Sequence, residues 1–340
     1  MNTENQIISE ILKNFKKSPL HKNNFFESDC EVIRLGNNDY LFTIDSYSEE
    51  DHFRVNDPYT LGVNLAVCTI SDIFACGGRP IFFSNSLTKE ESWNLDYVNS
   101  LSKGIASILE KCGIGFIGGD IGFSDRWNFT GIVIGETDKL IKRTGVKLND
   151  SIYVTGEIGN GNFEAASRLI KQGPELDLLF KRNKVKFPLR EKESQLISKY
   201  ANACIDTSDG LFKSLNILSE VNNTGFIISG IPYSSIGIDL VKLLSLPSET
   251  LMFGESGEYE LLFTVSPNNE EKLVVEAESI DIDLHKIGTV VDKSKKILHA
   301  YNRDIELSDF NIWGRDFDDH YQYIQRLTEY LKNKITKENV

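Results

Sequence analysis

The stretch Ala203-Cys-Ile-Asp206-Thr207-Ser-Asp-Gly210 predicts a short buried strand that ends in an acidic turn and leads into a helix. Its apolar residues are followed at once by turn-forming residues, which is typical of a strand end. Beyond Gly210, apolar residues recur at helical spacing to about Val221. Asp209 directly precedes this helix and is a candidate N-cap. The stretch is therefore one strand–turn–helix unit of an α/β fold.

Strands and helices alternate on both sides of this unit, which favours an α/β or α+β protein. Strand-like runs at residues 31–35 and 40–45 flank a turn at Gly36 and predict a hairpin. Asp57-Pro58 predicts the start of a helix that ends at Gly77-Gly78. Because 340 residues exceed the usual size of a single core, we expect two domains, residues 1–147 and residues 148–340.

Composition and charge exclude several classes of protein. The net charge of -13 disfavours a protein that follows a nucleic-acid backbone, although solubility alone is a sufficient explanation of the acidic surplus. No window approaches the ~18 consecutive apolar residues of a membrane span, and Met1 to Lys17 lacks the apolar segment of a signal peptide. The five cysteines form no C-x-x-C pair. We expect a cytoplasmic protein with neither a nucleic-acid nor a membrane partner.

One glycine motif resembles a dinucleotide fingerprint, but its context does not fit. Gly113-Ile-Gly115-Phe-Ile-Gly118 matches G-x-G-x-x-G, and Asp138 follows about 20 residues later. A helix precedes this motif, the glycines lie within the apolar strand that is expected to end at residues 118–120, and another strand follows. The fingerprint requires a strand before it and a helix after it, so we reject this interpretation. No P-loop motif is present either.

Aspartates recur at the predicted strand ends and beside glycines. Aspartate is a poor strand former and is costly to bury, so each one requires solvent, a cap or a cation. Each taken singly is more simply interpreted as a cap or turn residue. Several that converge would repel one another unless cations lay between them, and Mg²⁺ prefers carboxylate oxygens together with substrate phosphates. The aspartates concerned are Asp29, Asp45, Asp72, Asp120, Asp206 and Asp209.

Short motifs spread over most of the chain carry a family resemblance. In order they are Ser28-Asp-Cys30, Thr43-Ile-Asp45, His52-Phe53, Val63-Asn-Leu-Ala66, Ser71-Asp72, Ala75-Cys-Gly77, Ile117-Gly-Gly-Asp120, Lys142-Arg-Thr-Gly145, Asp150 to Gly156, Pro188-Leu-Arg190, Ile205 to Leu211, Ile231-Pro232, Tyr259 to Thr264 and Asp319-His-Tyr321. The chain resembles the thiamine-monophosphate kinases, which share a superfamily with aminoimidazole-ribonucleotide synthetase and selenophosphate synthetase. No single motif is specific, but their shared order is.

The resemblance implies a two-domain PurM-like fold whose N-terminal domains join into a β-barrel in a homodimer. It implies that the six aspartates bind several Mg²⁺ ions, and that Gly119, Arg143 and Ser208 contact ATP with Thr43 near the first metals. Asp120, Asp209 and Arg143 would be catalytic. The acceptor, thiamine monophosphate, would contact His52, Glu258 and Phe317, with Trp313 as the alternative aromatic residue. From the residues alone, His52 is more simply a loop histidine, Arg143 is equally a linker charge, and the two aromatics are at least as well explained as core residues.

The implied reaction is direct in-line transfer of the γ-phosphoryl group of ATP to the phosphate of thiamine monophosphate, which gives thiamine diphosphate. Four motifs depart from the family pattern. Thr43-Ile44-Asp45 stands where the family has Ser-Thr-Asp, and Ile121 stands where Gly-Gly-Asp-Thr has its threonine. Ser28 replaces the first aspartate of Gly-Asp-Asp, and Gly257 replaces the glutamate that contacts the acceptor, with Glu255 or Glu258 as candidate substitutes. Two alternatives therefore stay open: an ATP-dependent kinase or synthetase of the superfamily with another small-molecule substrate, and a nucleotide-binding regulatory paralogue.

Overall fold

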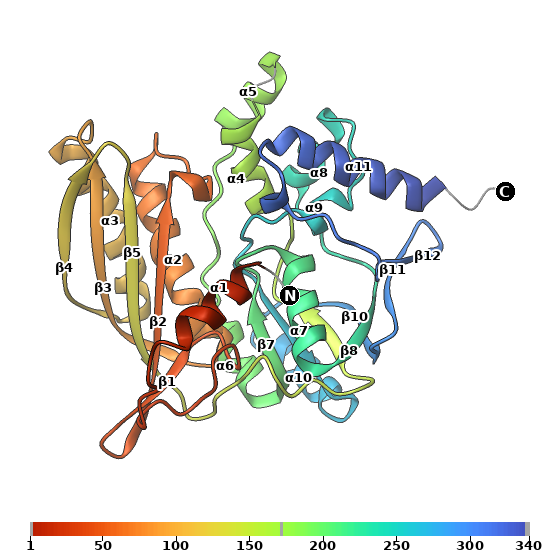
Figure 1. The fold of residues 1–340 in the computed structure, drawn as a ribbon, viewed down its shortest axis with the longest axis horizontal. Coiled ribbons are helices and arrows are strands. Elements are labelled where there is room, and N and C mark those ends of the chain that lie inside the picture. Colours follow the sequence, from red (N-terminus) through yellow and green to blue (C-terminus); the bar gives the residue numbers. More distant parts are fainter. Residues whose placement is uncertain (1–2, 171–172, 337–340) are drawn as a thin grey trace.

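The computed structural model describes residues 3–170 and 173–336 and builds them around two β-sheets (Figure 1). The first sheet has the strand order β1-β2-β5-β3-β4 and is antiparallel except for the parallel pair β3–β4. That pair is parallel because α3 (Leu95–Cys112) crosses between its strands. The strands are β1 (Glu31–Leu35), β2 (Asn38–Ser48), β3 (Arg79–Glu90), β4 (Gly115–Ser124) and β5 (Asn128–Glu136).

The second sheet has the order β12-β11-β8-β10-β6-β9-β7. Its strands are β6 (Ser151–Val154), β7 (Ala201–Asp206), β8 (Thr224–Ile228), β9 (Leu261–Val265), β10 (His285–Asp292), β11 (Lys296–Ala300) and β12 (Arg303–Glu306). The other helices are α1 (Thr3–Leu12), α2 (Pro58–Ala75), α4 (Asn160–Leu169), α5 (Gly173–Arg182), α6 (Glu191–Tyr200), α7 (Leu211–Asn222), α8 (Ser235–Leu243), α9 (Thr250–Phe253), α10 (Pro267–Ser279) and α11 (His320–Thr336), with short 3₁₀ helices η1 (Glu49–Asp51) and η2 (Gly314–Asp316). Within the described helices, no segment has the length and hydrophobicity to cross a bilayer.

The structure confirms the mixed α/β class, with the strand–turn–helix unit at β7 and α7. Two expected strand ends are wrong. β2 continues past Asp45 to Ser48. β4 continues through Asp120 to Ser124, because one extra residue in β4 between Phe116 and Gly119, where Gly118 has a positive φ, lets its pairing with β3 resume. The first sheet is open within the described residues, so the barrel of a homodimer stays a prediction. The domain boundary between residues 147 and 148 also stays a prediction, and the first two and last four residues of those ranges lie outside the described chain.

Helix α2 connects the two sheets. It is buried over most of its length and packs against β2 and β5 of the first sheet as well as β7 of the second. The side chain of Asn64 pairs with the carbonyl of Val185 and the N–H of Phe187, at 3.1 and 3.0 Å. At the other end of α2, Ser194 donates to the carbonyl of Phe74 at 2.7 Å. These buried bonds fix α2 relative to the second sheet, so any side chain on α2 that faces β7 is placed firmly.

Two glycines allow α2 to approach α3 closely. A Cβ on Gly62 would lie 2.0 Å from the carbonyl oxygen of Leu101, and one on Gly104 would lie 2.1 Å from that of Tyr59. Backbone atoms cannot move aside as a flexible side chain can, so neither position accepts even a methyl group without separation of the helices.

We predict that Gly62→Ala lowers the free energy of unfolding by about 2 kcal/mol, because overpacking at the helix contact outweighs the better helix propensity of alanine. Urea denaturation followed by circular dichroism measures the change. Gly115→Ala is the matched control, because the nearest atom to its added Cβ is a Phe82 ring carbon at 3.5 Å. Equal stability of Gly62→Ala and the wild type would contradict the close helix contact.

Candidate active site

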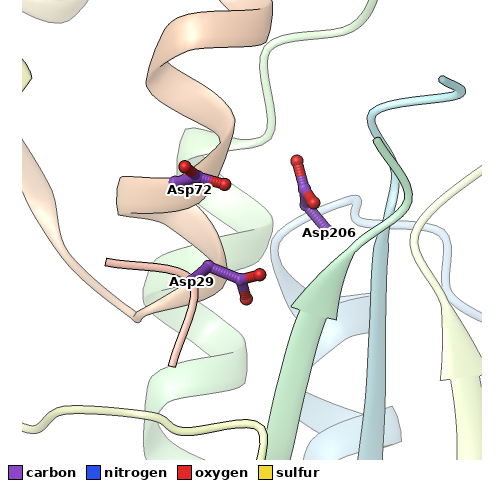
Figure 2. A group of neighbouring side chains, drawn as sticks. All are labelled: Asp29, Asp72 and Asp206. Atoms are coloured by element: carbon purple, nitrogen blue, oxygen red, sulfur yellow. The ribbon is translucent and has the colours of Figure 1, made fainter. Parts of the chain in front are cut away.

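Three of the predicted aspartates meet between the two sheets. Asp29 lies just before β1, Asp72 lies on α2 and Asp206 ends β7, and each offers a carboxylate oxygen within 4.8 Å of the other two (Figure 2). The fold thus brings together side chains that lie far apart in the sequence. We call these three residues the carboxylate triad.

Neighbouring side chains hold the triad in place. Thr43 donates its hydroxyl to Asp72 Oδ2 at 2.5 Å, and Ser208 donates its hydroxyl to Asp206 Oδ1 at 2.8 Å. Arg143 donates to Asp29 Oδ1 from Nε at 2.9 Å and from a terminal nitrogen at 2.5 Å. The other oxygen of Asp29, Oδ2, is buried and has no hydrogen-bond partner in the described structure. The triad is therefore ordered, and one oxygen still lacks a partner.

The nearby positive charge does not offset the burial and mutual repulsion of the aspartates. Burial raises the pKa of Asp29 to about 6 against the effect of Arg143, and burial together with the Asp206 charge raises the pKa of Asp45 to about 7. Burial and the nearby Asp45 charge raise the pKa of Asp72 well above its usual range. Asp45 therefore lies close enough to act as a fourth acidic group beside the triad.

These oxygens fit a divalent cation. Hard cations such as Mg²⁺ take carboxylate oxygens as ligands. A cation at this site would offset the repulsion among the carboxylates and would give Asp29 Oδ2 a partner. Arg143 supplies one positive charge to the buried group, through Asp29. Within the described residues, the three oxygens of the triad form the one cluster of potential metal ligands this close together.

Asp120 and Gly119 lie away from the triad, on β4 at the edge of the first sheet. Strands β5 and β3 separate β4 from β2, the strand of Asp45, so the backbones are about 14 Å apart at the usual strand spacing. Asp120 pairs with Ser86, which faces away from buried Phe83 and Leu87. Its side chain is therefore exposed on the open face of the sheet, opposite α2.

Asp209 does not cap α7, because Gly210 occupies the N-cap position and no side chain makes a cap bond there. Asp209 instead pairs with Lys213 one turn later, Oδ2 to Nζ, at 2.9 Å. The expected N-cap is therefore wrong. Gly210 adopts a positive φ of 84°, which turns the chain between Asp209 and the helix.

Of the residues expected to contact the acceptor, His52 lines a small cavity, whereas Glu258 and Phe317 are not among its lining residues. His52 follows η1 and lines this cavity together with Asp51, Phe53, Ser256 and Gly257, and the remaining lining residues are Gly161, Glu164, Ala165, Phe187 and Tyr259. Burial and the nearby Arg168 charge lower the pKa of His52. The cavity separates the segment after β2 from α4, so it lies between the two halves of the chain.

Glu258 is buried and accepts hydrogen bonds from the first turn of α4. Its carboxylate accepts the N–H groups of Gly161 and Asn162 at 2.8 and 3.3 Å, and burial raises its pKa to about 7. Glu255, the alternative, accepts the N–H of Gly314 instead. Of the two aromatic candidates, Phe317 contacts Tyr323, whereas Trp313 packs among the aromatic residues of the second domain.

Two neighbours of the aspartates were not singled out from the sequence. Ser71 hydrogen-bonds to Asp206 and opposes the rise in its pKa, and Lys213 pairs with Asp209. Ser71 stands beside Asp72 in a quoted motif, which was the available signal. Lys213 follows Asp209 by four residues, the spacing of a helical ion pair, and that spacing could have indicated it.

Comparison with known proteins identifies the family of the chain. Residues 27–137 match the family model described as AIR synthase related protein, N-terminal domain. The thiamine-monophosphate kinase of Bacillus subtilis (strain 168) is 32% identical over 268 residues, which cover 75% of this chain and 81% of that protein. The enzyme of that name from Buchnera aphidicola subsp. Acyrthosiphon pisum (strain APS) is 30% identical over 315 residues, which cover 87% and 96%.

Among solved structures, one described as AaThiL complexed with AMPPCP and TMP superposes with a TM-score of 0.71 at 24% identity, and covers 90% of this chain and 97% of its own. The fold and the family model together define a protein of the AIR synthase-related, PurM-like class. Within that class, the extent and identity of the curated matches show that the chain belongs to the thiamine-monophosphate kinase family, and the protein is an enzyme of the kinase class.

We predict that the metal-free protein becomes less stable as the pH rises from 5 to 8. The buried aspartates have folded-state pKa values above the ordinary value near 4, with Asp45 at about 7, so between these values the folded state binds more protons than the unfolded state. Stability then falls as pH rises through this window. Thermal unfolding in EDTA measures it.

Asp72→Asn should reduce this fall and raise the stability at pH 8 by on the order of 1 kcal/mol, because one repelling charge is removed. The exposed Asp125→Asn is the matched control and should leave the profile unchanged. If metal-free wild type and Asp72→Asn show the same pH profile, the aspartates do not repel one another in the folded protein.

Proposed function

We propose that this enzyme transfers the γ-phosphoryl group of ATP to the phosphate of thiamine monophosphate, which gives thiamine diphosphate, with several Mg²⁺ ions at the aspartates. The observation that carries the proposal is the convergence of Asp29, Asp72 and Asp206 within 4.8 Å. Relatives that bear the name of this activity, and the fold shared with a kinase described with AMPPCP and TMP, support the choice of substrates. The cytoplasmic location expected from the sequence remains part of the proposal.

The residues of the chain would contribute to the reaction mainly by positioning the metal ions and the phosphates. The triad and Asp45 would hold Mg²⁺, and Thr43 and Ser208 orient two of these carboxylates. When bound, Mg²⁺ neutralises the donor phosphates and the charge that develops during transfer. Arg143 lies beside Asp29 and would place its guanidinium against the nucleotide phosphates. No general base is needed, because the acceptor phosphate is already ionised at neutral pH.

A homodimer would complete the site. The open face and edge of the first sheet expose large apolar side chains: Ile44 at 54%, Phe82 at 43%, Phe116 at 57%, Ile121 at 54% and Phe123 at 67%. Exposed apolar residues on an unpaired edge strand mark an association surface. Because Gly119 and Asp120 lie on this strand, we propose that they reach the nucleotide bound by a second copy, as the family resemblance implies for the dimer. Asp209 would complete the metal ligands from the turn beside Asp206.

For the acceptor, we propose that His52 and Phe317 make direct contacts. Glu258 would act as a positioning residue, because its carboxylate holds the first turn of α4 beside the cavity. Gly257 leaves no room for the glutamate usual in the family, since even a Cβ there would lie 2.6 Å from the Tyr259 ring. The acceptor side of the site thus differs from the family pattern more than the nucleotide side does.

The direct test is turnover of ATP and thiamine monophosphate by the purified protein with Mg²⁺. We predict formation of thiamine diphosphate and a loss of about 100-fold or more in kcat for Asp120→Asn, because a ligand of the Mg²⁺ that would hold the reacting phosphates is lost. Asp125→Asn, on the adjacent turn, is the control and should retain activity. Turnover with other acceptors alone would indicate another reaction of the superfamily, and nucleotide binding without turnover would indicate a regulator.

Mixed dimers give this test a second readout. If Asp72 and Asp120 of one site come from different subunits, then mixing inactive Asp72→Asn and Asp120→Asn chains restores about a quarter of the wild-type activity, since half of the dimers are mixed and each has one intact site. Absence of any recovery, in dimers shown to exchange subunits, would contradict a shared site.

A further inference from the structure

The cavity beside His52 adjoins the carboxylate triad. Its lining residue Gly257 is so close to the turn after β7 that an added Cβ would lie 2.7 Å from the carbonyl oxygen of Ser208. Ser208 in turn donates its hydroxyl to Asp206. A molecule in the cavity would therefore lie next to the end of the triad contributed by the second domain.

Three basic side chains gather beside this cavity, and hydrogen bonds connect the segments that carry them. Arg168, near the end of α4, donates to the carbonyl of Phe53 at 2.6 Å, next to His52. The ring of His320, at the start of α11, lies 2.9 Å from the carbonyl oxygen of Leu169, next to Arg168. The charges of Arg168 and His320 both act on His52 and lower its pKa.

Glu164 and Asp51, the two acidic residues that line the cavity, have other partners. Glu164 lines the cavity but is paired with Arg54 at 2.6 Å and accepts the N–H of Val185 at 2.7 Å. Asp51 accepts the N–H of Ser48 at 2.6 Å. Asp319 lies 3.6 Å from the ring of its neighbour His320. None of these carboxylates pairs with Arg168 in the described structure.

Arg168 differs in this respect from three other partly buried arginines. Arg54, Arg143 and Arg190 each have a carboxylate within 2.6 Å. Arg168 has no acidic partner among residues 3–170 and 173–336, a property that it shares with Arg303, whose guanidinium bonds to the carbonyl of Ile335. A half-buried guanidinium near another basic group is unfavourable unless an anion compensates it. Its single bond to Phe53 uses one N–H group, so other N–H groups of the fork are available to an anion.

We propose that Arg168, together with His52 and His320, binds the phosphate group of the acceptor, which makes Arg168 a specificity-determining residue of this enzyme. This inference rests on the proposed function. The ligand class is a phosphate monoester, because its dianionic, three-oxygen group suits the donor fork of arginine. The site would hold the acceptor by its phosphate, next to the nucleotide phosphates at the triad.

The protein has five histidines, so the imidazole C2–H signals of its NMR spectrum can be assigned by substitution. Additions of inorganic phosphate, thiamine monophosphate and thiamine should be compared. We expect the two phosphates to shift the signals of His52 and His320 in a saturable way, thiamine monophosphate at the lower concentration, and to leave His21, His285 and His299 unmoved. Thiamine, which lacks a phosphate, should not reproduce the shifts.

Arg168→Met should abolish these shifts and raise KM for thiamine monophosphate about 10- to 100-fold without a change in KM for ATP, because hydrogen bonds to charged groups are lost. Arg168→Lys keeps the charge and should partly restore both the NMR shifts and the KM for thiamine monophosphate. This variant controls for the possibility that Arg168→Met is misfolded. Arg182→Met, at an exposed position on α5, is the matched control and should behave as wild type.

Phosphate-dependent shifts that persist in Arg168→Met, or thiamine monophosphate that binds no tighter than inorganic phosphate, would overturn the inference. A different outcome would contradict the proposed function alone. If the wild type shows the shifts but forms no thiamine diphosphate, the protein has the anion site but does not carry out the proposed reaction. Wild type that forms thiamine diphosphate with an unchanged KM in Arg168→Met has the reaction without this anion site.

Discussion

The candidate site depends on buried carboxylates whose mutual repulsion a bound cation would relieve. Asp29, Asp72 and Asp206 approach within 4.8 Å of one another, and each ionised pair at this distance costs roughly 3 kcal/mol at an effective dielectric constant of about 20. Arg143 offsets part of this cost at Asp29. The packing of α2 against both sheets supplies the stabilisation that keeps the carboxylates together, although their repulsion lowers the stability of the metal-free protein.

The two halves of the molecule contribute different parts of the site. The first sheet and α2 supply Asp45, Asp72 and the hydroxyl of Thr43, whereas β7 and its turn supply Asp206 and Ser208. The cavity beside His52 lies where the halves meet, next to the unpaired guanidinium of Arg168. Carboxylates on one side would hold the metal-bound donor phosphates and basic groups on the other would hold the acceptor phosphate next to them, which is the arrangement that in-line transfer requires.

Local patterns predicted the elements well, because strand, turn and cap preferences act over a few residues. The Ala203 to Gly210 unit, the start of α2 at Pro58 and the rejection of a dinucleotide fingerprint all agree with the structure. Side-chain destinations were harder to predict, because they depend on strand register and on competing partners. Asp120 lies on the open face of β4, Asp209 pairs with Lys213, and Glu258 bonds to the start of α4. Arg168 had no sequence signal, since its missing counterion is visible only in three dimensions.

The most direct test of the central claim is the binding of Mn²⁺, as a spectroscopic substitute for Mg²⁺, measured by electron paramagnetic resonance in the absence of nucleotide. The account predicts saturable binding to the wild type and at least about tenfold weaker binding to Asp206→Asn, because that substitution removes the ligand contributed by the second sheet. Equal Mn²⁺ affinity of the two proteins, both shown to be folded, would contradict a cation site shared between the two sheets.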